Sequence, residues 1–153
     1  MDSNPDQGEL FGRLPGGQQV VDWFGFVPTF HDASLRRLEI TSKSVVIEIE
    51  AFRMTSEVDA QGYFILDRHA LVTLRCADVT GISLRGSATG TIILQMNIQR
   101  IGTRLPDWDQ YEGPDVGDYE VKFDSACGFD GSIFGQKLSF ELVPLVLVDD
   151  QLS

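Results

Sequence analysis

The sequence is poor in the residues that most often build reactive or metal-binding centres. Its 153 residues include only two cysteines, Cys76 and Cys127, and two histidines, His31 and His69. These residues show neither the CxxC nor the HxxxH spacing of a zinc site. There is also no GxSxG motif and no glycine-rich turn that opens a phosphate-binding helix. We therefore expect no metal, no cofactor and no enzymatic activity, and we interpret Cys76 as a small core residue.

Long hydrophobic runs are missing as well. No stretch approaches the ~20 apolar residues of a membrane-spanning helix, and the opening MDSNPDQGEL lacks the basic and apolar regions of a secretion signal. A composition of 42% hydrophobic and 23% charged residues is nevertheless that of a folded domain, and the length fits one such domain. These features predict a cytoplasmic protein that does not bind membranes.

Basic residues are scarce in the C-terminal third. The chain has a net charge of −11, of which residues 105–153 contribute −9, from 11 acidic and two basic side chains; residues 1–104 contribute −2, from 12 acidic and 10 basic ones. Such a field repels nucleic acid and anionic membranes, but it speeds the encounter with a basic protein partner. A simpler alternative is that the acidic surface only keeps the protein dissolved.

Helical periodicity is confined to one short segment. QQVVDWFGF (18–26) could form a single short helix after a loose N-terminal segment at 1–17, and from Leu35 onward hydrophobic residues recur at every second position. LRRLEITSKSVVIEIEAF predicts a hairpin, whereas MTSEVDAQG (54–62) is expected to be a loop. Six to eight strands joined without helices predict a mainly β fold. We expect a single antiparallel domain at 18–148, either a β-sandwich or an open barrel. The side chains expected to face inward are Leu38, Ile40, Val45, Ile47, Ile49, Val72, Leu74, Cys76, Ile82, Leu84, Ile92, Leu94, Met96, Ile98, Tyr119, Val121, Phe123, Leu138, Phe140 and Leu142.

The segment FVPTFHDASL (26–35) places His31 next to Asp32. Neighbouring side chains in an extended segment point to opposite sides, so adjacency alone does not make a catalytic pair. The alternative is structural. Asp32 would accept hydrogen bonds from backbone N–H groups two or three residues on, and His31 would be buried between Phe30 and Trp23. We favour this second interpretation, in which the four residues fix the turn into the first strand.

An acidic and aromatic stretch lies between Pro106 and Asp118. It resembles an EF-hand loop only superficially, because Tyr111 and Glu112 occupy positions that need a ligand and a glycine. Aromatic rings among carboxylates are typical of contact loops that bind a basic partner, although Trp108 could instead fold back over the sheet. The predicted partner-binding residues are Asp107, Trp108, Asp109, Tyr111, Glu112, Asp115 and Asp118.

Several segments together resemble a known family. WFGFVPTFHDASL, VTLRCADVTGISLRG, TIILQMNIQRI and YEVKFDSACGFDGSIFGQKLSFELV are similar, in this order, to elements of the immunity protein 50 family of bacterial polymorphic-toxin systems. The similarity extends over residues 23–143, with Val27 between the aromatic residue and Pro28 as one departure and the acidic stretch as another. This resemblance implies a small cytoplasmic protein that binds and neutralises a toxin domain and carries out no chemistry itself.

Two further classes of function stay open. A hydrolase or carbohydrate-active enzyme would need a pocket that gathers Asp32, His69 and a carboxylate from another strand. A structural subunit would pair through an exposed edge strand, and a homodimer is compatible with the same feature.

Overall fold

A computed structural model describes residues 7–87, 92–103, 113–126 and 128–145. Its elements are α1 (Gln7–Arg13), α2 (Gly17–Phe24), β1 (Ser34–Ile40), β2 (Ser44–Val58), β3 (Phe64–Arg85), β4 (Ile93–Arg100), β5 (Tyr119–Ser125) and β6 (Asp130–Pro144). All paired strands are antiparallel, and the six strands form one open sheet in the order β1-β2-β3-β6-β5-β4. The predicted mainly β, antiparallel fold is confirmed.

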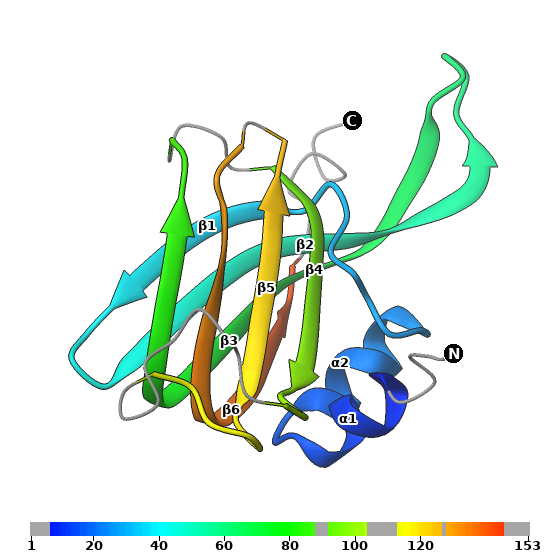
Figure 1. Cartoon of the computed structure of the whole chain (residues 1–153). Coiled ribbons are helices and arrows are strands. Elements are labelled where there is room, and N and C mark those ends of the chain that lie inside the picture. The colour runs from blue at the N-terminus through cyan, green and yellow to red at the C-terminus, as the bar shows by residue number, and fades with distance from the viewer. Residues whose placement is uncertain (1–6, 88–91, 104–112, 127, 146–153) are drawn as a thin grey trace.

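The sheet bends sharply in the middle of its two central strands. Asp78 in β3 has a φ of 53°, and the register between β3 and β6 shifts between Val79 and Gly81. Opposite this bend, a Cβ added to Gly135 of β6 would lie 2.4 Å from the Cys76 sulfur, so only glycine fits there. The bend lets β1 and β2 cross behind β4 and β5 (Figure 1), which encloses the core between the two halves of one sheet.

The two edges of the curled sheet meet at one corner. Ser34 at the start of β1 forms a bridge with Ile92, the Asp32 N–H donates to the Ile93 carbonyl (2.7 Å), and the Ile93 N–H donates to the Ala33 carbonyl (2.8 Å). Beyond this corner no pairing between β1 and β4 is found among the described residues. The architecture therefore corresponds to the open-barrel alternative rather than to two separate packed sheets.

The N-terminal region differs from its prediction, because two helices form where at most one was expected. Residues 7–13, assigned to the loose segment, form α1, whose Phe11 is buried and stacks on Phe140 of β6 with ring centroids 5.0 Å apart. The Phe140 N–H donates to the Pro15 carbonyl (2.8 Å), and a Cβ at Gly16 would collide with the Phe140 carbonyl oxygen. The helix α1 is therefore stabilised by tertiary contacts with β6. Its own sequence is too short and too rich in glycine to predict a helix.

Most predicted inward positions are buried, but three of them are exposed. Ile40 ends β1 and is 49% exposed, Leu94 is 45% exposed, and Ile92 is also exposed, whereas Ile93 is buried. The register of β4 shifts between Ile93 and Gln95, and this bulge moves the apolar face by one residue. Met96 and Ile98, beyond the bulge, face the core as predicted.

The hairpin of β2 and β3 extends well beyond the sheet (Figure 1). The last pair between β1 and β2 is Ser34 with Glu50, and the last pair between β3 and β6 is Ala70 with Pro144, whereas β2 and β3 pair as far as Val58 and Phe64. The expected loop at 54–62 is therefore mostly strand, which corrects the prediction. We call residues 52–69 the arm.

Candidate protein-interaction surfaces

The predicted partner-binding residues fall into two groups. Asp107, Trp108, Asp109, Tyr111 and Glu112 lie outside the described residues. Asp115 is exposed at the surface, and Asp118 is buried at 6% exposure. The Asp118 carboxylate accepts hydrogen bonds from the Thr80 hydroxyl (2.8 Å) and the Asp115 backbone N–H (3.0 Å), and this contact closes the start of β5 onto β3.

A second carboxylate, Glu120 on β5, is also held by neutral donors. Glu120 is 8% exposed, and it accepts one hydrogen bond from the Gln99 amide (2.6 Å) and one from the Ser132 hydroxyl (2.6 Å). Asp118, directly before β5, and Glu120 on β5 therefore lie two residues apart, and the bonds that hold both of them come from uncharged groups. Such bonds keep the carboxylates in place without cancelling their charge.

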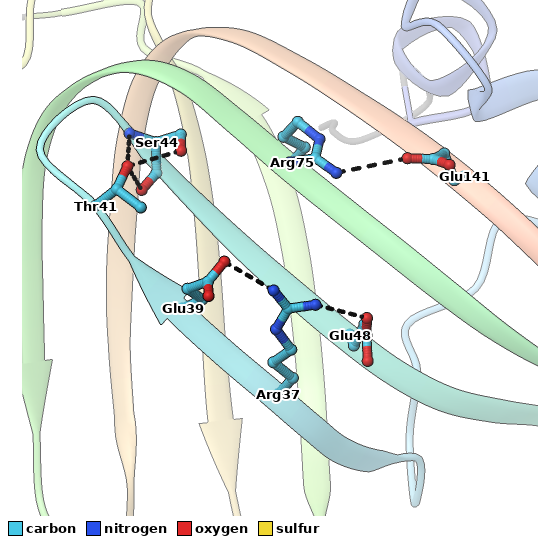
Figure 2. A network of polar contacts seen from close by, with 7 residues as sticks. All are labelled: Arg37, Glu39, Thr41, Ser44, Glu48, Arg75 and Glu141. Carbon is cyan, nitrogen blue, oxygen red and sulfur yellow. Dashed lines mark hydrogen bonds and ion pairs between the residues drawn. The ribbon is translucent and has the colours of Figure 1, made fainter.

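Cations, in contrast, are mostly neutralised within the fold. Arg37 on β1 lies between Glu39 (2.8 Å) and Glu48 (3.1 Å), and Arg75 on β3 lies 3.6 Å from Glu141 on β6 (Figure 2). Seven basic side chains of the described part form ion pairs with carboxylates of the same chain: Arg13, Arg36, Arg37, Arg53, Arg75, Arg85 and Lys137. In the described part of the chain, the charge that ion pairs leave unbalanced is consequently negative.

The His31 segment is a strained turn. Phe30 and Asp32 both have positive φ, 59° and 66°, and the Ala33 N–H donates to the Phe30 carbonyl. Because a carbonyl only accepts, the His31 Nδ1–H must donate to the Leu94 carbonyl (2.7 Å), which ties the turn to β4. The predicted burial is wrong, since the His31 side chain is 59% exposed. Asp32 lies 3.6 Å from the His31 Nε2.

Trp23 has a different neighbour from the one expected. Its indole N–H donates to the Arg68 carbonyl (2.9 Å), and the Arg68 guanidinium lies 4.7 Å from the centre of the ring. Phe30 instead packs edge-on against Phe24, with centroids 6.4 Å apart. Trp23 thus fastens α2 to the base of the arm rather than enclosing His31.

A groove of about 250 Å³ lies where the arm leaves the sheet. Its lining contains His31 but no carboxylate; the residues are Phe24, Phe26, Val27, Pro28, Thr29, Phe30, His31, Ala51, Phe52 and Met54. His69, the other histidine, lies against the Phe52 ring, with centroids 5.8 Å apart. The structure therefore does not bring Asp32 and His69 together around this groove, and the groove offers an apolar surface.

The arm was missed as a surface by the sequence analysis. Cross-strand partners lie on the same face of a ribbon, and the pairs Met54–Leu66 and Val58–Phe64 therefore give the arm one apolar face. These four side chains are 47%, 38%, 55% and 55% exposed, respectively. We call Met54, Val58, Phe64 and Leu66 the apolar strip; the signal that could have found it is the run YFIL (63–66) directly after the turn.

The base and the tip of the arm are both held by polar contacts. At the base, Arg53 and Asp67 form two hydrogen bonds (2.8 and 2.7 Å), and the hydrogen bond from Arg53 lowers the pKa of the Asp67 carboxyl below its usual value. At the tip, the Asp59 carboxylate accepts from the Gln61 and Tyr63 N–H groups (2.9 and 3.0 Å). The Asp59 carboxylate therefore orders the turn that joins the two strands of the arm.

Cys76 has the surroundings of a structural core residue. Cys76 is buried, as expected, and burial followed by the charges of Asp118 and Asp78 raises the pKa of its thiol to about 11.

In the described ranges, no three His, Cys, Asp or Glu side chains gather as metal ligands would. No helix in that part of the chain has the length and apolarity to cross a membrane.

Comparisons with known proteins give no relative. No family model matches the chain, and no curated protein or solved structure matches it either.

Proposed function

We propose that the chain is a non-enzymatic binding protein that captures a basic protein partner through its acidic surface. The partner would be a toxin domain that the chain neutralises in the cytoplasm, as the resemblance to immunity proteins implies. The observation that carries this proposal is the internal pairing of the cations. Seven basic side chains already bind carboxylates of the same chain, whereas Asp118 and Glu120 are held by neutral donors.

The charge distribution supports a particular mode of encounter. Residues 105–153 carry a net charge of −9, and the exposed Asp115 lies at the end of the predicted contact stretch. A concentrated negative field attracts a positively charged surface over distances of about 10 Å at moderate salt. The two held carboxylates add to that field, and the aromatic side chains Trp108 and Tyr111 would supply the contact energy after the encounter.

The proposal can be tested by capture of the partner. Proteins encoded beside the gene would be mixed with the tagged chain, and bound proteins would be identified by mass spectrometry. We expect a stoichiometric basic protein that is toxic when produced alone. The double variant Asp107→Lys, Asp109→Lys should lose this protein while its melting temperature stays nearly unchanged.

A matched control distinguishes the effect of the local charge at residues 107 and 109 from the effect of the net charge of the chain. The double variant Glu9→Lys, Asp22→Lys changes the net charge by the same amount, but its substitutions lie on α1 and α2. Capture that survives in this control and fails in the first variant supports the proposal. Equal loss in both variants, or no basic partner for the unmodified chain, contradicts it.

A further inference from the structure

The arm exposes an apolar face that a solitary chain would normally bury. A two-stranded ribbon is marginally stable by itself in water, and contiguous exposed apolar side chains commonly mark an interaction surface. The strip residues Met54, Val58, Phe64 and Leu66 are all more than a third exposed, and Tyr63 at the tip is 72% exposed. Within the described residues, no third strand pairs with the arm beyond Glu50 of β2 and Ala70 of β3, and the Leu145 N–H donates only to its base, at the His69 carbonyl (2.9 Å).

The strip runs without interruption into the groove at the base of the arm. Met54 belongs to both, and it is followed in the groove by Phe52, Phe26 and Pro28. The apolar surface therefore has two ends: the aromatic side chains Tyr63 and Phe64 at the tip, and a hollow of about 250 Å³ at the base. An aromatic ring at one end and an apolar hollow at the other are complementary shapes.

The charges at the tip and at the base of the arm are also complementary. The tip carries two carboxylates, Glu57 and Asp59, and no cation; the base carries two cations, Arg53 and Arg68, and one carboxylate, Asp67. The tip is thus net −2 and the base is net +1. Two arms that lie side by side in the same direction would bring like ends together, whereas antiparallel arms would bring each negative tip to a positive base.

We propose that the arm binds a second copy of this chain, with the two arms antiparallel about a two-fold axis and the strips facing each other. In this arrangement the Phe64 end of each strip lies at the groove of the other copy. The same patch meets itself, so every favourable contact occurs twice, which is the geometry of most homodimers. This inference concerns the arm and is independent of the acidic surface that we propose for the basic partner.

The dimensions of the arm suit such a dimer. The register between β2 and β3 shifts between Met54 and Val58, so the length of the arm follows from β3, which rises about 10 Å from Phe64 to Asp67. This length is the overlap available to two antiparallel arms. The strip, Tyr63 and the accessible groove residues Phe26, Val27, Thr29, His31 and Phe52 give each copy a surface of ten side chains, since Phe24 and Phe30 are buried in the core. Stable interfaces use roughly 20 to 30 residues on each side, so this smaller surface fits a weak dimer that forms as the concentration rises.

Sedimentation equilibrium of the full chain tests the proposal. We expect the unmodified chain to pass from monomer to dimer as its concentration rises. Phe64→Ser and Val58→Asp should each raise the dissociation constant about tenfold or more. Val143→Ser, at a valine that is 56% exposed on β6 and lies outside the arm, should leave the dissociation constant unchanged.

A charge swap tests the antiparallel direction. Glu57→Lys should weaken the dimer by placing a cation near Arg68 of the other copy, and the double variant Glu57→Lys, Arg68→Glu should recover most of the loss. Circular dichroism confirms that each variant is folded. A dimer that responds to neither variant, or one that the double substitution fails to restore, contradicts the antiparallel pairing.

Salt separates this contact from the capture of a basic partner. Each copy has a net charge of −11, so added salt screens the repulsion between copies as well as the attraction of tip to base and should leave the dimer largely intact, whereas it should weaken the capture of a basic protein. A chain that stays monomeric at high concentration and high salt overturns the proposal. Loss of partner capture in Phe64→Ser, with the unmodified chain monomeric, would assign the arm to that partner instead.

Discussion

The sheet body and the arm share the strands β2 and β3 but differ in which side chains these strands bury. In the body, Val45, Ile47 and Val72 are almost fully buried, and charged side chains of the outer face pair across strands. In the arm, the four residues of the apolar strip are more than a third exposed, and the ion pair of Arg53 with Asp67 holds only the base. β2 and β3 therefore extend beyond what the core needs, and exposed apolar side chains of this kind commonly mark an interaction surface.

The largest expected contrast lies between two phenylalanines. Phe11→Ala in the body should reduce the free energy of unfolding by about 3–5 kcal/mol, because Phe11 is 1% exposed and its removal leaves a cavity against Phe140. Phe64→Ala in the arm should change it by less than about 0.5 kcal/mol in dilute solution, where the chain is monomeric. Urea unfolding of both variants measures the two values. Similar losses would remove the distinction between body and arm.

Two glycine substitutions test whether the bend between β3 and β6 requires a residue without a side chain. Gly135→Ala should destabilise the fold by about 1–3 kcal/mol, because the new Cβ would lie 2.4 Å from the Cys76 sulfur and 3.0 Å from the Ala77 carbonyl oxygen. Gly102→Ala is the matched control, since no atom lies within 4 Å of its added Cβ. Thermal unfolding compares them. An unaffected Gly135→Ala variant would mean that β3 and β6 can separate at the bend without cost.

The His31 turn joins the groove to the edge of the body. His31→Ala should cost about 0.5–1.5 kcal/mol through loss of the hydrogen bond to the Leu94 carbonyl. His31→Asn, which keeps a donor near the position of Nδ1, should recover part of that loss in urea unfolding. A loss above this range would indicate that the exposed ring is more deeply packed than its 59% exposure suggests.

The smallest effect is expected at the base of the arm in acid. The folded-state pKa of Asp67 lies below its ordinary value, so its contribution is fully present above that ordinary value and is lost as the pH falls through the folded-state pKa. Amide signals of the arm should therefore change in strong acid before those of the body. Asp67→Asn should remove this pH dependence, and arm signals that still titrate in the variant would point to another carboxylate.

Much of the body could be predicted from the sequence because its strands alternate regularly. The hairpin at 35–52 is found as expected, and the buried residues Leu74, Val121 and Phe140 lie on the inward face. Alternation fails where the backbone inserts a residue, as it does between Ile93 and Gln95, because a bulge reverses the faces without changing composition. The helix α1 was hidden because its stability comes from Phe140, which lies far along the chain.

The candidate surfaces could be predicted less well, and for physical reasons. Glycine and polar residues at 54–62 resemble a loop, and only the register of Val58 with Phe64 shows that pairing continues through them. The sequence likewise identifies Asp118 as acidic but not as buried, because its two donors, Thr80 and the Asp115 N–H, come from separate segments. The type of a residue determines its charge, but its exposure to solvent depends on the fold.

The measurement that most directly tests the distinction between arm and body is amide hydrogen exchange as a function of protein concentration. We expect amides of residues 52–69 to exchange quickly in dilute solution and to slow markedly once the dimer forms, while those of the body exchange slowly throughout. Arm amides that exchange at the same rate at every concentration, with a dimer present by sedimentation, would contradict the claim that the arm is the contact surface.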